Sequence, residues 1–468
     1  MSTTAPPQRT IPPPGPVGLW PLGPSVGATF DPRSFYAKLH REYGDIAGYR
    51  IARHRFYVIN DPDSIQAVLA ARTQLYQRHA APGTPSPIVG MGLIRNEGAP
   101  WKKQRGIIQG SMSKEQSAVM MEACLEAFVR SARPLVEQGR ADLFPAVKRM
   151  MFAGMSSALV SELPGEDIYA AFCRILESID PEDSELSRIF QTLALVFTPA
   201  NMPPPTGRAS SVMSGLHAWV DDVIARRRSA PATEPRDVLD RLLAARGPDG
   251  APAMDDRQLR DELVTLYFTS FTTLSKVVGW TLCLLNAAPE ALRRARAELD
   301  AVCGDGPLRA EHLPRLQYLT WACQESMRLV PPQTLLIRYL NTADELGGYR
   351  LEAGAQVHIC TWTTHRHPRY WKDPEAFVPE RFSPERAAEV PRWLYLPFGG
   401  GQRACVGTHL SLAMLPAALG TLLQLAEVSF TRPGLPALAP GFTIRPRAPV
   451  ELKLTPRALG TGVSGAAA

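Results

Sequence analysis

The 468-residue sequence lacks the features that mark exported, membrane-spanning and nucleic-acid-binding chains. It has no run of about 18 uninterrupted apolar residues and no basic start followed by an apolar stretch, so neither a membrane anchor nor a signal peptide is predicted. It has no block of five or six like charges, and its formal net charge of +6 is spread along the chain, which argues against a nucleic-acid partner. We therefore expect a cytoplasmic protein whose mild positive charge suits an acidic protein partner.

Cysteine is scarce and unpaired. The seven cysteines are odd in number and form no C-x-x-C pair, so neither a disulfide framework nor a zinc site is indicated, and a reducing compartment fits. They are Cys124, Cys173, Cys283, Cys303, Cys323, Cys360 and Cys405.

The order of hydrophobic patterns predicts a mainly α fold with a smaller β-rich region. Residues 1–30 hold a proline cluster and are expected to form an extended lead-in, while residues 456–468 are expected to form a flexible tail. Helical patterns dominate from about residue 114 to 299, and β-branched residues at 46–59 and near the C-terminus predict strands. The stretch 259–286 is apolar nearly all round, which predicts a buried helix through the protein centre.

The most informative segment is a glycine-rich loop, residues 397–407, with the sequence PFGGGQRACVG. Glycines let the backbone approach a flat cofactor closely, and the helix dipole favours the thiolate of a cysteine at a helix N-terminus. Because thiolates bind metals, Cys405 is a candidate metal ligand. The alternative for an isolated cysteine is a buried structural thiol behind a glycine turn.

The pattern F-x-x-G-x-R-x-C-x-G in this loop resembles the haem-binding loop of the cytochrome P450 family. The resemblance implies haem b (iron protoporphyrin IX) as the cofactor, with Cys405 as the axial metal ligand. It also implies that Arg403 pairs with a haem propionate and that Phe398 packs beside the sulfur. The pattern's glycines, Gly401 and Gly407, complete the cofactor-binding loop.

Two further motifs follow the family's order and spacing. Glu325 and Arg328 lie three residues apart, so on a helix they share one face, although most such pairs are solvated surface contacts. Together with the later P-E-R-F segment, the resemblance implies a buried structural triad of Glu325, Arg328 and Arg381 that supports the cysteine loop. Truncating one partner of such a buried set is expected to be costly.

A basic helix near residue 101 carries a third motif. Trp101 and Arg105 lie four residues apart on one helical face and match the family's W-x-x-x-R helix, which implies that both bind a propionate. Arg338, six residues beyond Pro332, matches a further propionate-binding arginine. The neighbouring Lys102 and Lys103 are candidate contacts for an electron donor. The tripeptide His365-Arg366-His367 is interpreted as a polar loop rather than a metal site.

The central helix departs from the family pattern. Relatives carry A-G-x-(D/E)-T over the haem, and an ungapped alignment places Thr269, Ser270, Phe271, Thr272 and Thr273 on these positions. A register shifted by one residue puts Phe268 and Phe271 on the alanine and acid positions; we prefer the first because it keeps small side chains at the oxygen groove. Either register lacks the carboxylate.

The missing acid bears on proton supply, because a hydroxyl only exchanges hydrogen bonds near neutral pH. Ordered water, a substrate hydroxyl, or the hydroxyls of Thr269, Ser270 and Thr272 are possible substitutes, which leaves Thr273 to hydrogen-bond the oxygen molecule. We therefore name Thr273 and Thr272 as the candidate catalytic residues. A second departure is Pro416, which is expected to bend the helix after Gly407 and has no assigned role.

The resemblance replaces the roughly three domains that length alone suggests with one haem-thiolate domain, residues 31–455. It implies a monomeric bacterial monooxygenase of specialised metabolism that hydroxylates or epoxidises an apolar small molecule, with electrons from ferredoxin and ferredoxin reductase. Coupling, desaturation or rearrangement, and a non-catalytic sensor or carrier, remain alternatives. The expected substrate pocket draws on apolar and small side chains, namely Ile88, Leu93, Phe197, Phe268, Thr269, Phe271, Leu335 and Leu336.

Overall fold

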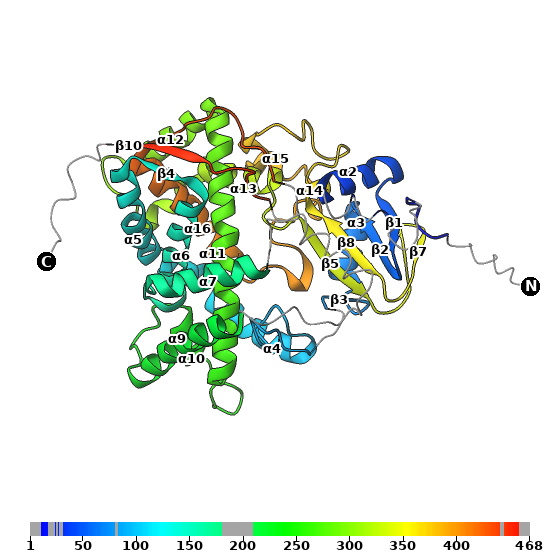
Figure 1. Cartoon of the computed structure of the whole chain (residues 1–468), viewed down its shortest axis with the longest axis horizontal. Coiled ribbons are helices and arrows are strands. Elements are labelled where there is room, and N and C mark those ends of the chain that lie inside the picture. Colours follow the sequence, from blue (N-terminus) through cyan, green and yellow to red (C-terminus); the bar gives the residue numbers. More distant parts are fainter. Residues whose placement is uncertain are drawn as a thin grey trace, which may run out of the picture.

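The computed structural model describes residues 11–16, 24, 27, 31–79, 83–179, 209–439 and 444–457. Helices form one part of the molecule and a small twisted sheet lies beside them, as Figure 1 shows. The predicted mainly α fold with a smaller β-rich region is therefore confirmed. The predicted pocket residue Phe197 and residues 458–468 of the predicted tail lie outside the described residues.

The helical part is built from long helices that bury apolar faces against one another. Among the described residues these are α4 (Gly98–Ser111), α5 (Lys114–Gln138), α6 (Leu143–Val160), α7 (Glu166–Ile179), α9 (Ala209–Ser229), α10 (Val238–Ala244), α11 (Asp256–Ala287), α12 (Pro289–Cys303), α13 (Gln317–Leu329) and α16 (Thr408–Leu425). Shorter helical segments are α2 (Pro32–Tyr43), α3 (Pro62–Gln66), the π-helical Ala67–Ala71, α14 (Thr361–Thr364) and α15 (Pro384–Ala387).

Helix α11 runs through the centre of the helical part (Figure 1). It begins at the N-cap Asp255, whose side chain accepts the backbone N–H of Gln258 at 2.8 Å. Most of its side chains are buried, as its all-round apolar sequence predicts, and it packs against α6, α9, α13 and α16. One core cluster joins these helices, so α11 is the scaffold on which the rest of the helical part is assembled.

The sheet part contains five strands in the order β1-β2-β8-β5-β3. Strands β1 (Ile46–Ile51) and β2 (His54–Ile59) form a hairpin, β2 pairs in parallel with β8 (Gln356–Cys360), and β5 (Leu335–Leu340) pairs antiparallel with β8 and with β3 (Tyr76–Gln77). A second sheet has the order β4 (Arg140–Asp142), β10 (Glu451–Pro456), β9 (Ala426–Phe430), and β6 (Asp344–Leu346) pairs with β7 (Tyr349–Leu351). Chain segments about 300 residues apart thus meet in one sheet.

Part of the N-terminal lead-in is docked on the sheet. Ile11 forms a parallel bridge with Tyr349, and the carbonyl of Pro14 accepts the N–H of Gly48 at 2.8 Å. The expectation that order begins near residue 31 was therefore too late in the sequence. Prolines restrict the backbone to extended conformations that can still lie along a sheet edge, which sequence pattern alone does not reveal.

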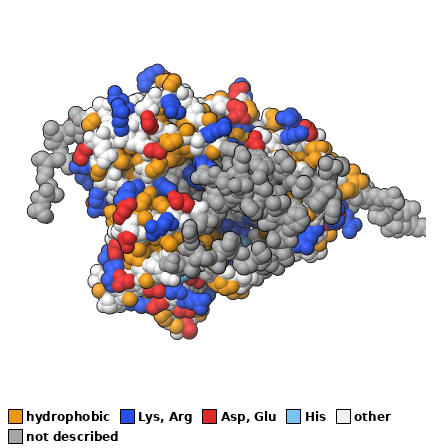
Figure 2. All heavy atoms as spheres, viewed as in Figure 1, with side chains coloured by type: hydrophobic (Ala, Val, Ile, Leu, Met, Phe, Trp, Pro, Cys, Tyr) orange, Lys and Arg blue, Asp and Glu red, His pale blue; other side chains and the backbone are white. Residues whose placement is uncertain are grey.

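Two helices, α11 and α16, are long and apolar enough to cross a membrane by length and composition. Their most apolar windows are 72% and 67% buried inside the protein, which is the behaviour of core helices. Helix α16 continues past Pro416, which is itself buried. On the face shown in Figure 2, acidic and basic side chains of the described residues are interspersed, with no large block of one sign.

Candidate functional site

The glycine-rich loop packs against the π-helical segment Ala67–Ala71. Gly399 and Gly401 have φ of +69° and +67°, and a Cβ on Gly401 would lie only 1.7 Å from the carbonyl oxygen of Leu69. The backbone N–H of Cys405 donates to the carbonyl of Phe398 at 2.8 Å, and α16 starts three residues further on. The loop thus fixes Cys405 immediately before the first turn of a buried helix.

Cys405 is exposed, whereas the other six cysteines are buried or half-buried. Crowding by protein atoms raises the pKa of its thiol by desolvation, and the backbone N–H of Gly407 and the charges of Arg105 and Arg78 act in the opposite direction. A bound metal cation would complete this shift toward the thiolate. The exposed sulfur has the surroundings expected of a metal ligand.

Four arginines, Arg78, Arg105, Arg338 and Arg403, gather around this loop, and we call them the arginine cluster. The charge of Arg78 acts on both Arg338 and Arg403, and Arg105 acts on Arg403. Arg105 donates to the carbonyl of Ala404 at 2.8 Å, next to the cysteine. The guanidinium carbon of Arg403 lies 3.8 Å from the ring centroid of Trp101, and that of Arg105 lies 5.7 Å from it.

Negative charge in the arginine cluster is scarce. Within the described part of the chain, its one ion pair to a carboxylate joins Arg403 to Glu97, which also accepts the backbone N–H of Arg78. Burial together with neighbouring guanidinium groups lowers the pKa of Arg338 and that of Arg403 to about 10. Such crowding of positive charge destabilises the cluster until an anion joins it.

Glu325, Arg328 and Arg381 meet in the interior, where Glu325 and Arg328 are fully buried. Arg328 donates to both carboxylate oxygens of Glu325 at 2.7 and 2.8 Å, and Arg381 donates to the same carboxylate at 3.2 Å. The other N–H groups of Arg328 donate to the backbone carbonyls of His365, Pro374 and Ala376, and Arg381 donates to that of Asp373. The triad therefore clamps the segment 365–376 against α13.

His365 connects this clamp to the cysteine loop. The backbone N–H of Leu396 donates to His365 Nε2 at 2.8 Å, and the carbonyl of Leu396 accepts the N–H of Gly399 at 3.0 Å. Full burial lowers the pKa of His365 to about 3, so the ring stays neutral and keeps this acceptor. The interpretation of His365 as a polar loop residue was wrong, because its side chain is buried in the core.

On α11, Thr269 and Thr273 share one face and Phe271 points elsewhere. Thr273 donates to the carbonyl of Thr269 at 3.0 Å, Thr269 donates to the carbonyl of Thr265 at 2.8 Å, and Thr269 is exposed. Phe271 has no exposed surface and packs edge-on against Phe152. This arrangement favours the first of the two registers, with small polar side chains along the groove.

A family comparison decides the identity of the fold. The family model described as cytochrome P450 matches residues 12–451. The chain belongs to the cytochrome P450 family. Among curated relatives of this P450, cyclooctatin synthase from Streptomyces melanosporofaciens is 28% identical over 446 residues, which is 94% of this chain and 93% of the relative. Carotene epsilon-monooxygenase from Arabidopsis thaliana is 27% identical over 455 residues, 90% and 81% of the two chains.

Solved P450 structures share the fold at low identity. The retinoic acid-bound cyanobacterial CYP120A1 superimposes with a TM-score of 0.80 at 22% identity, covering 96% of this chain and 100% of that one. The heme domain of cytochrome P450DA gives the same TM-score at 20% identity, covering 96% and 98%. The family match and the relatives named as monooxygenases show a cytochrome P450 monooxygenase that uses haem iron, and the solved structures share its fold.

The residues of this P450 fit haem on their own geometry. The exposed Cys405 thiol is suited to bind iron, and the four guanidinium groups of the arginine cluster have one carboxylate partner, Glu97, among the described residues, so they can take the two further anions that propionates would supply. Trp101 and Phe398 border the site, Trp101 under the Arg403 guanidinium and Phe398 as a half-buried member of the loop. The structure therefore brings together every cofactor-binding residue predicted from the sequence: Cys405, Arg403, Phe398, Gly401, Gly407, Trp101, Arg105 and Arg338.

The predicted pocket is only partly supported. Ile88, Leu336 and Thr269 keep exposed surface, whereas Leu93 and Phe268 are largely buried. Two assignments were wrong. Phe271 belongs to the aromatic core, and Leu335 packs with the cluster formed by α2 and the sheet. Apolar character alone does not distinguish a pocket residue from a core residue. The side of the helix or strand on which the residue lies decides between the two.

Sequence reasoning missed Arg78 and Glu262. Arg78 matched none of the motifs, so only its fold neighbours place it beside Cys405. Glu262 is fully buried on α11 and accepts the backbone N–H of Leu93 at 2.9 Å, while its neighbour Asp261 accepts that of Met91 at 2.9 Å. Burial raises the pKa of Glu262 to about 8. An acidic pair at the start of an apolar helix was the available signal.

Proposed function

We propose that this P450 inserts one atom of dioxygen into a largely apolar small molecule, by hydroxylation or epoxidation. The observation that carries the proposal is an exposed thiol in a loop around which four arginines gather, with one carboxylate, Glu97, paired to them among the described residues. Helix α11 adds a face that carries the hydroxyls of Thr269 and Thr273. Bound haem b would supply oxygen activation, and Cys405 would hold its iron through the thiolate sulfur. The chain's own residues hold that cofactor, shape the groove and handle protons.

In this proposal Cys405 and the arginine cluster each hold a different part of the haem. Cys405 presents its sulfur from a loop held by the Phe398 carbonyl, and Trp101 fixes the Arg403 guanidinium by contact with its face. The triad of Glu325, Arg328 and Arg381 holds the segment that carries His365, and His365 in turn holds the loop. In this proposal the triad is a structural support for the ligand loop.

Thr273 and Thr272 manage hydrogen bonds at the groove. The Thr273 hydroxyl donates its hydrogen to the Thr269 carbonyl, so the lone pairs of Oγ1 accept hydrogen bonds from the groove side. Thr272 stands where relatives carry an acid and is only half-buried. Without a carboxylate there, protons reach Thr273 through ordered water or the hydroxyl of Thr269, which lies one helical turn away.

The substrate class follows from relatives and from the groove. Relatives carry the names carotene epsilon-monooxygenase and cyclooctat-9-en-7-ol 5-monooxygenase, and one solved neighbour holds retinoic acid. These are terpenoid compounds, long or cyclic hydrocarbons with few polar groups. We propose a terpenoid-like substrate in bacterial specialised metabolism, in contact with Ile88 and Leu336 and with the Thr269 hydroxyl as its one polar neighbour.

Electrons come from separate proteins in this proposal, a ferredoxin and its reductase. Lys102 and Lys103 are exposed on α4, one and two residues after the buried Trp101 of the cofactor site. Exposed cations beside a cofactor attract an acidic donor and raise its association rate. We propose a monomeric cytoplasmic enzyme on the same grounds of surface and sequence.

Incubation with a terpenoid panel, a ferredoxin system and ¹⁸O-labelled dioxygen tests the insertion. We expect a hydroxylated or epoxidised product that contains one labelled atom. Oxidised product without label, under conditions that exclude exchange with water, contradicts insertion.

Oxidation without insertion is the second candidate, and the absent acid at Thr272 favours it. Coupling, desaturation or rearrangement places different demands on proton delivery, and each gives an unlabelled product in the same experiment. A protein that shows thiolate ligation but no turnover with any substrate or reductant is a sensor or carrier.

A further inference from the structure

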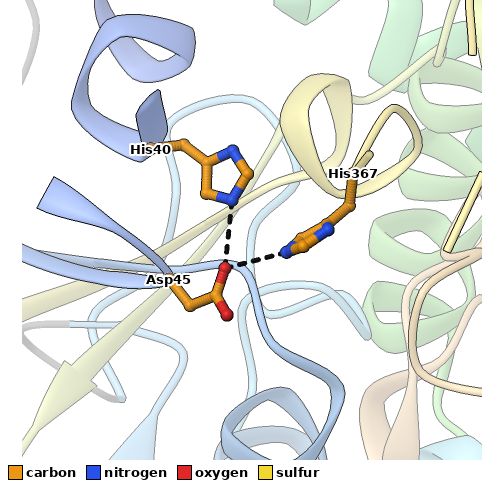
Figure 3. Close-up of side chains that lie close together, drawn as sticks. All are labelled: His40, Asp45 and His367. Atoms are coloured by element: carbon orange, nitrogen blue, oxygen red, sulfur yellow. Dashed lines mark hydrogen bonds and ion pairs between the residues drawn. The ribbon is translucent and has the colours of Figure 1, made fainter. Parts of the chain in front are cut away.

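A cluster of two histidines and one aspartate lies on the sheet side of the molecule (Figure 3). His40 stands in the last turn of α2, Asp45 lies just before β1, and His367 follows α14. The Nε2 atoms of His40 and His367 lie 3.0 and 2.8 Å from the same oxygen, Oδ1 of Asp45. The three potential ligand atoms all lie within 4.8 Å of one another.

We propose that His40, Asp45 and His367 form a binding site for a divalent transition-metal ion, zinc in particular. Zinc takes imidazole nitrogen and carboxylate oxygen at about 2.0–2.2 Å, with ligand atoms of a tetrahedral site about 3.3 Å apart. The two distances from Asp45 Oδ1 are close to this value, and the imidazole nitrogens lie within 4.8 Å of each other, so side-chain rotations can bring the three ligand atoms into place. Water completes the fourth position, because Asp45 and His40 keep 22% and 16% of their side chains exposed.

The groups around the cluster fit this role. The other carboxylate oxygen of Asp45, Oδ2, pairs with Arg369, so Oδ1 remains for the metal while Arg369 orients the carboxylate.

One hydrogen bond of His367 disfavours metal binding. The backbone N–H of Arg369 points at His367 Nδ1 at 3.3 Å, which favours a proton on Nε2. Metal binding at Nε2 moves that proton to Nδ1 and sacrifices this long hydrogen bond. We therefore expect a site weaker than those of zinc-dependent folds, one that stabilises the folded chain without being needed for folding.

The site joins distant parts of the chain. His40 and Asp45 belong to the N-terminal α2–β1 segment, and His367 lies within the segment 365–376 that the Glu325 triad clamps. A bound ion would tie the sheet side to the core that carries the cysteine loop. This inference stands on the cluster alone and does not depend on the proposed function.

Zinc binding is tested on the haem-loaded full chain after treatment with a chelator. Titration calorimetry with zinc alone is expected to show one site in the wild type, with affinity reduced at least about tenfold in His40→Gln and in His367→Gln. His312→Gln is the matched control, because the His312 side chain is also 16% exposed but stands outside the cluster. Equal zinc affinity in the wild type and the double variant His40→Gln/His367→Gln overturns the proposal.

X-ray absorption at the zinc edge gives a second reading that does not rely on variants. We expect a shell of nitrogen and oxygen neighbours with two imidazoles and no sulfur. A sulfur neighbour assigns the metal to a cysteine and contradicts the site. An unchanged visible haem spectrum in the variants shows that the cofactor site is intact, so a failed zinc site and a failed haem assignment are told apart.

Discussion

The molecule holds two groups of buried arginines with opposite electrostatic character. In the triad, Glu325 receives three hydrogen bonds from two guanidinium groups, the other N–H groups of Arg328 donate to backbone carbonyls, and Arg381 also donates to the carbonyl of Asp373. In the arginine cluster, four guanidinium groups share Glu97, which pairs with Arg403. The first group is complete within the chain, and the second is short of negative charge.

The difference shows that a network of buried charges can either support the fold or bind a ligand. A network whose donors are all satisfied needs nothing from outside, so it serves the fold. A network with unbalanced charge binds an external counter-ion or shifts its protons. Glu262 illustrates the second course, since burial and the negative charge of Asp261 raise its pKa.

Breaking the triad has the largest expected effect. Arg328→Ala leaves Glu325 buried without its main partner and is expected to lower the free energy of unfolding by about 3–5 kcal/mol, measured by denaturant titration. Glu166→Gln, which breaks the exposed pair between Glu166 and Arg149, is the control and is expected to change it by less than about 1 kcal/mol. Equal effects of the two substitutions contradict the distinction between a clamp and a surface pair.

Removing a charge from the arginine cluster is expected to act on the cofactor more than on the fold. Arg338→Gln relieves repulsion from Arg78 and Arg403, so the stability of the haem-free protein is retained, while haem transfer to an acceptor protein becomes about 10–100-fold faster. A variant that loses stability but keeps its haem as firmly as the wild type shows that Arg338 belongs with the triad instead.

The dependence of stability on pH tests whether Glu262, a buried charge with unbalanced surroundings, is protonated in the folded protein. Its native pKa of about 8 lies above its ordinary 4.5, so the folded state holds a proton that the unfolded state has lost, and stability falls as pH rises from about 4.5 to 8. Between pH 6.5 and 8, the wild type is expected to lose up to about 1.4 kcal/mol per pH unit relative to Glu262→Gln, which keeps the Leu93 hydrogen bond.

The range from pH 6.5 to 8 avoids a competing effect of two buried histidines on stability. Burial lowers the pKa of His358 and that of His365 to about 3, so stability also falls as pH drops below 6.5, where the unfolded histidines take up protons. Parallel stability curves for the wild type and Glu262→Gln above pH 6.5 mean that Glu262 is ionised in the folded protein.

The smallest expected effect is on product yield per electron, and it differs between the two threonines of the groove. Thr273→Ala is expected to divert reducing equivalents to peroxide and to lower product yield per electron several-fold, about 1 kcal/mol, whereas Thr272→Ala has a smaller effect. Peroxide and product are measured together in one reaction. Equal product yields per electron in the wild type and Thr273→Ala contradict the assigned role of Thr273.

The fold and the cofactor residues were predictable because each belongs to a local motif. Cys405 and Arg403 stand in one loop, and Trp101 and Arg105 on one helical face, so spacing along the chain carried the information. The β1–β2 hairpin also followed from pattern, since the strands predicted at 46–59 rest on local residue types.

Other features depend on contacts between distant segments. Arg78 lies near Cys405 only because β3 pairs with β5, and His40 meets His367 only because α2 packs on α14. Phe271 and Leu335 were misassigned for the same reason, as the side of an element that faces a pocket is set by tertiary packing. The docking of Ile11 on Tyr349 is a further contact of this kind.

The reduced, carbon-monoxide-bound spectrum of the wild type and of Cys405→Ala tests the central claim most directly, that Cys405 is the thiolate ligand of a haem held by the arginine cluster. The wild type is expected to show the spectrum of thiolate-ligated haem, and Cys405→Ala is expected to lose it at equal protein concentration. A thiolate spectrum that persists unchanged in Cys405→Ala would contradict the account.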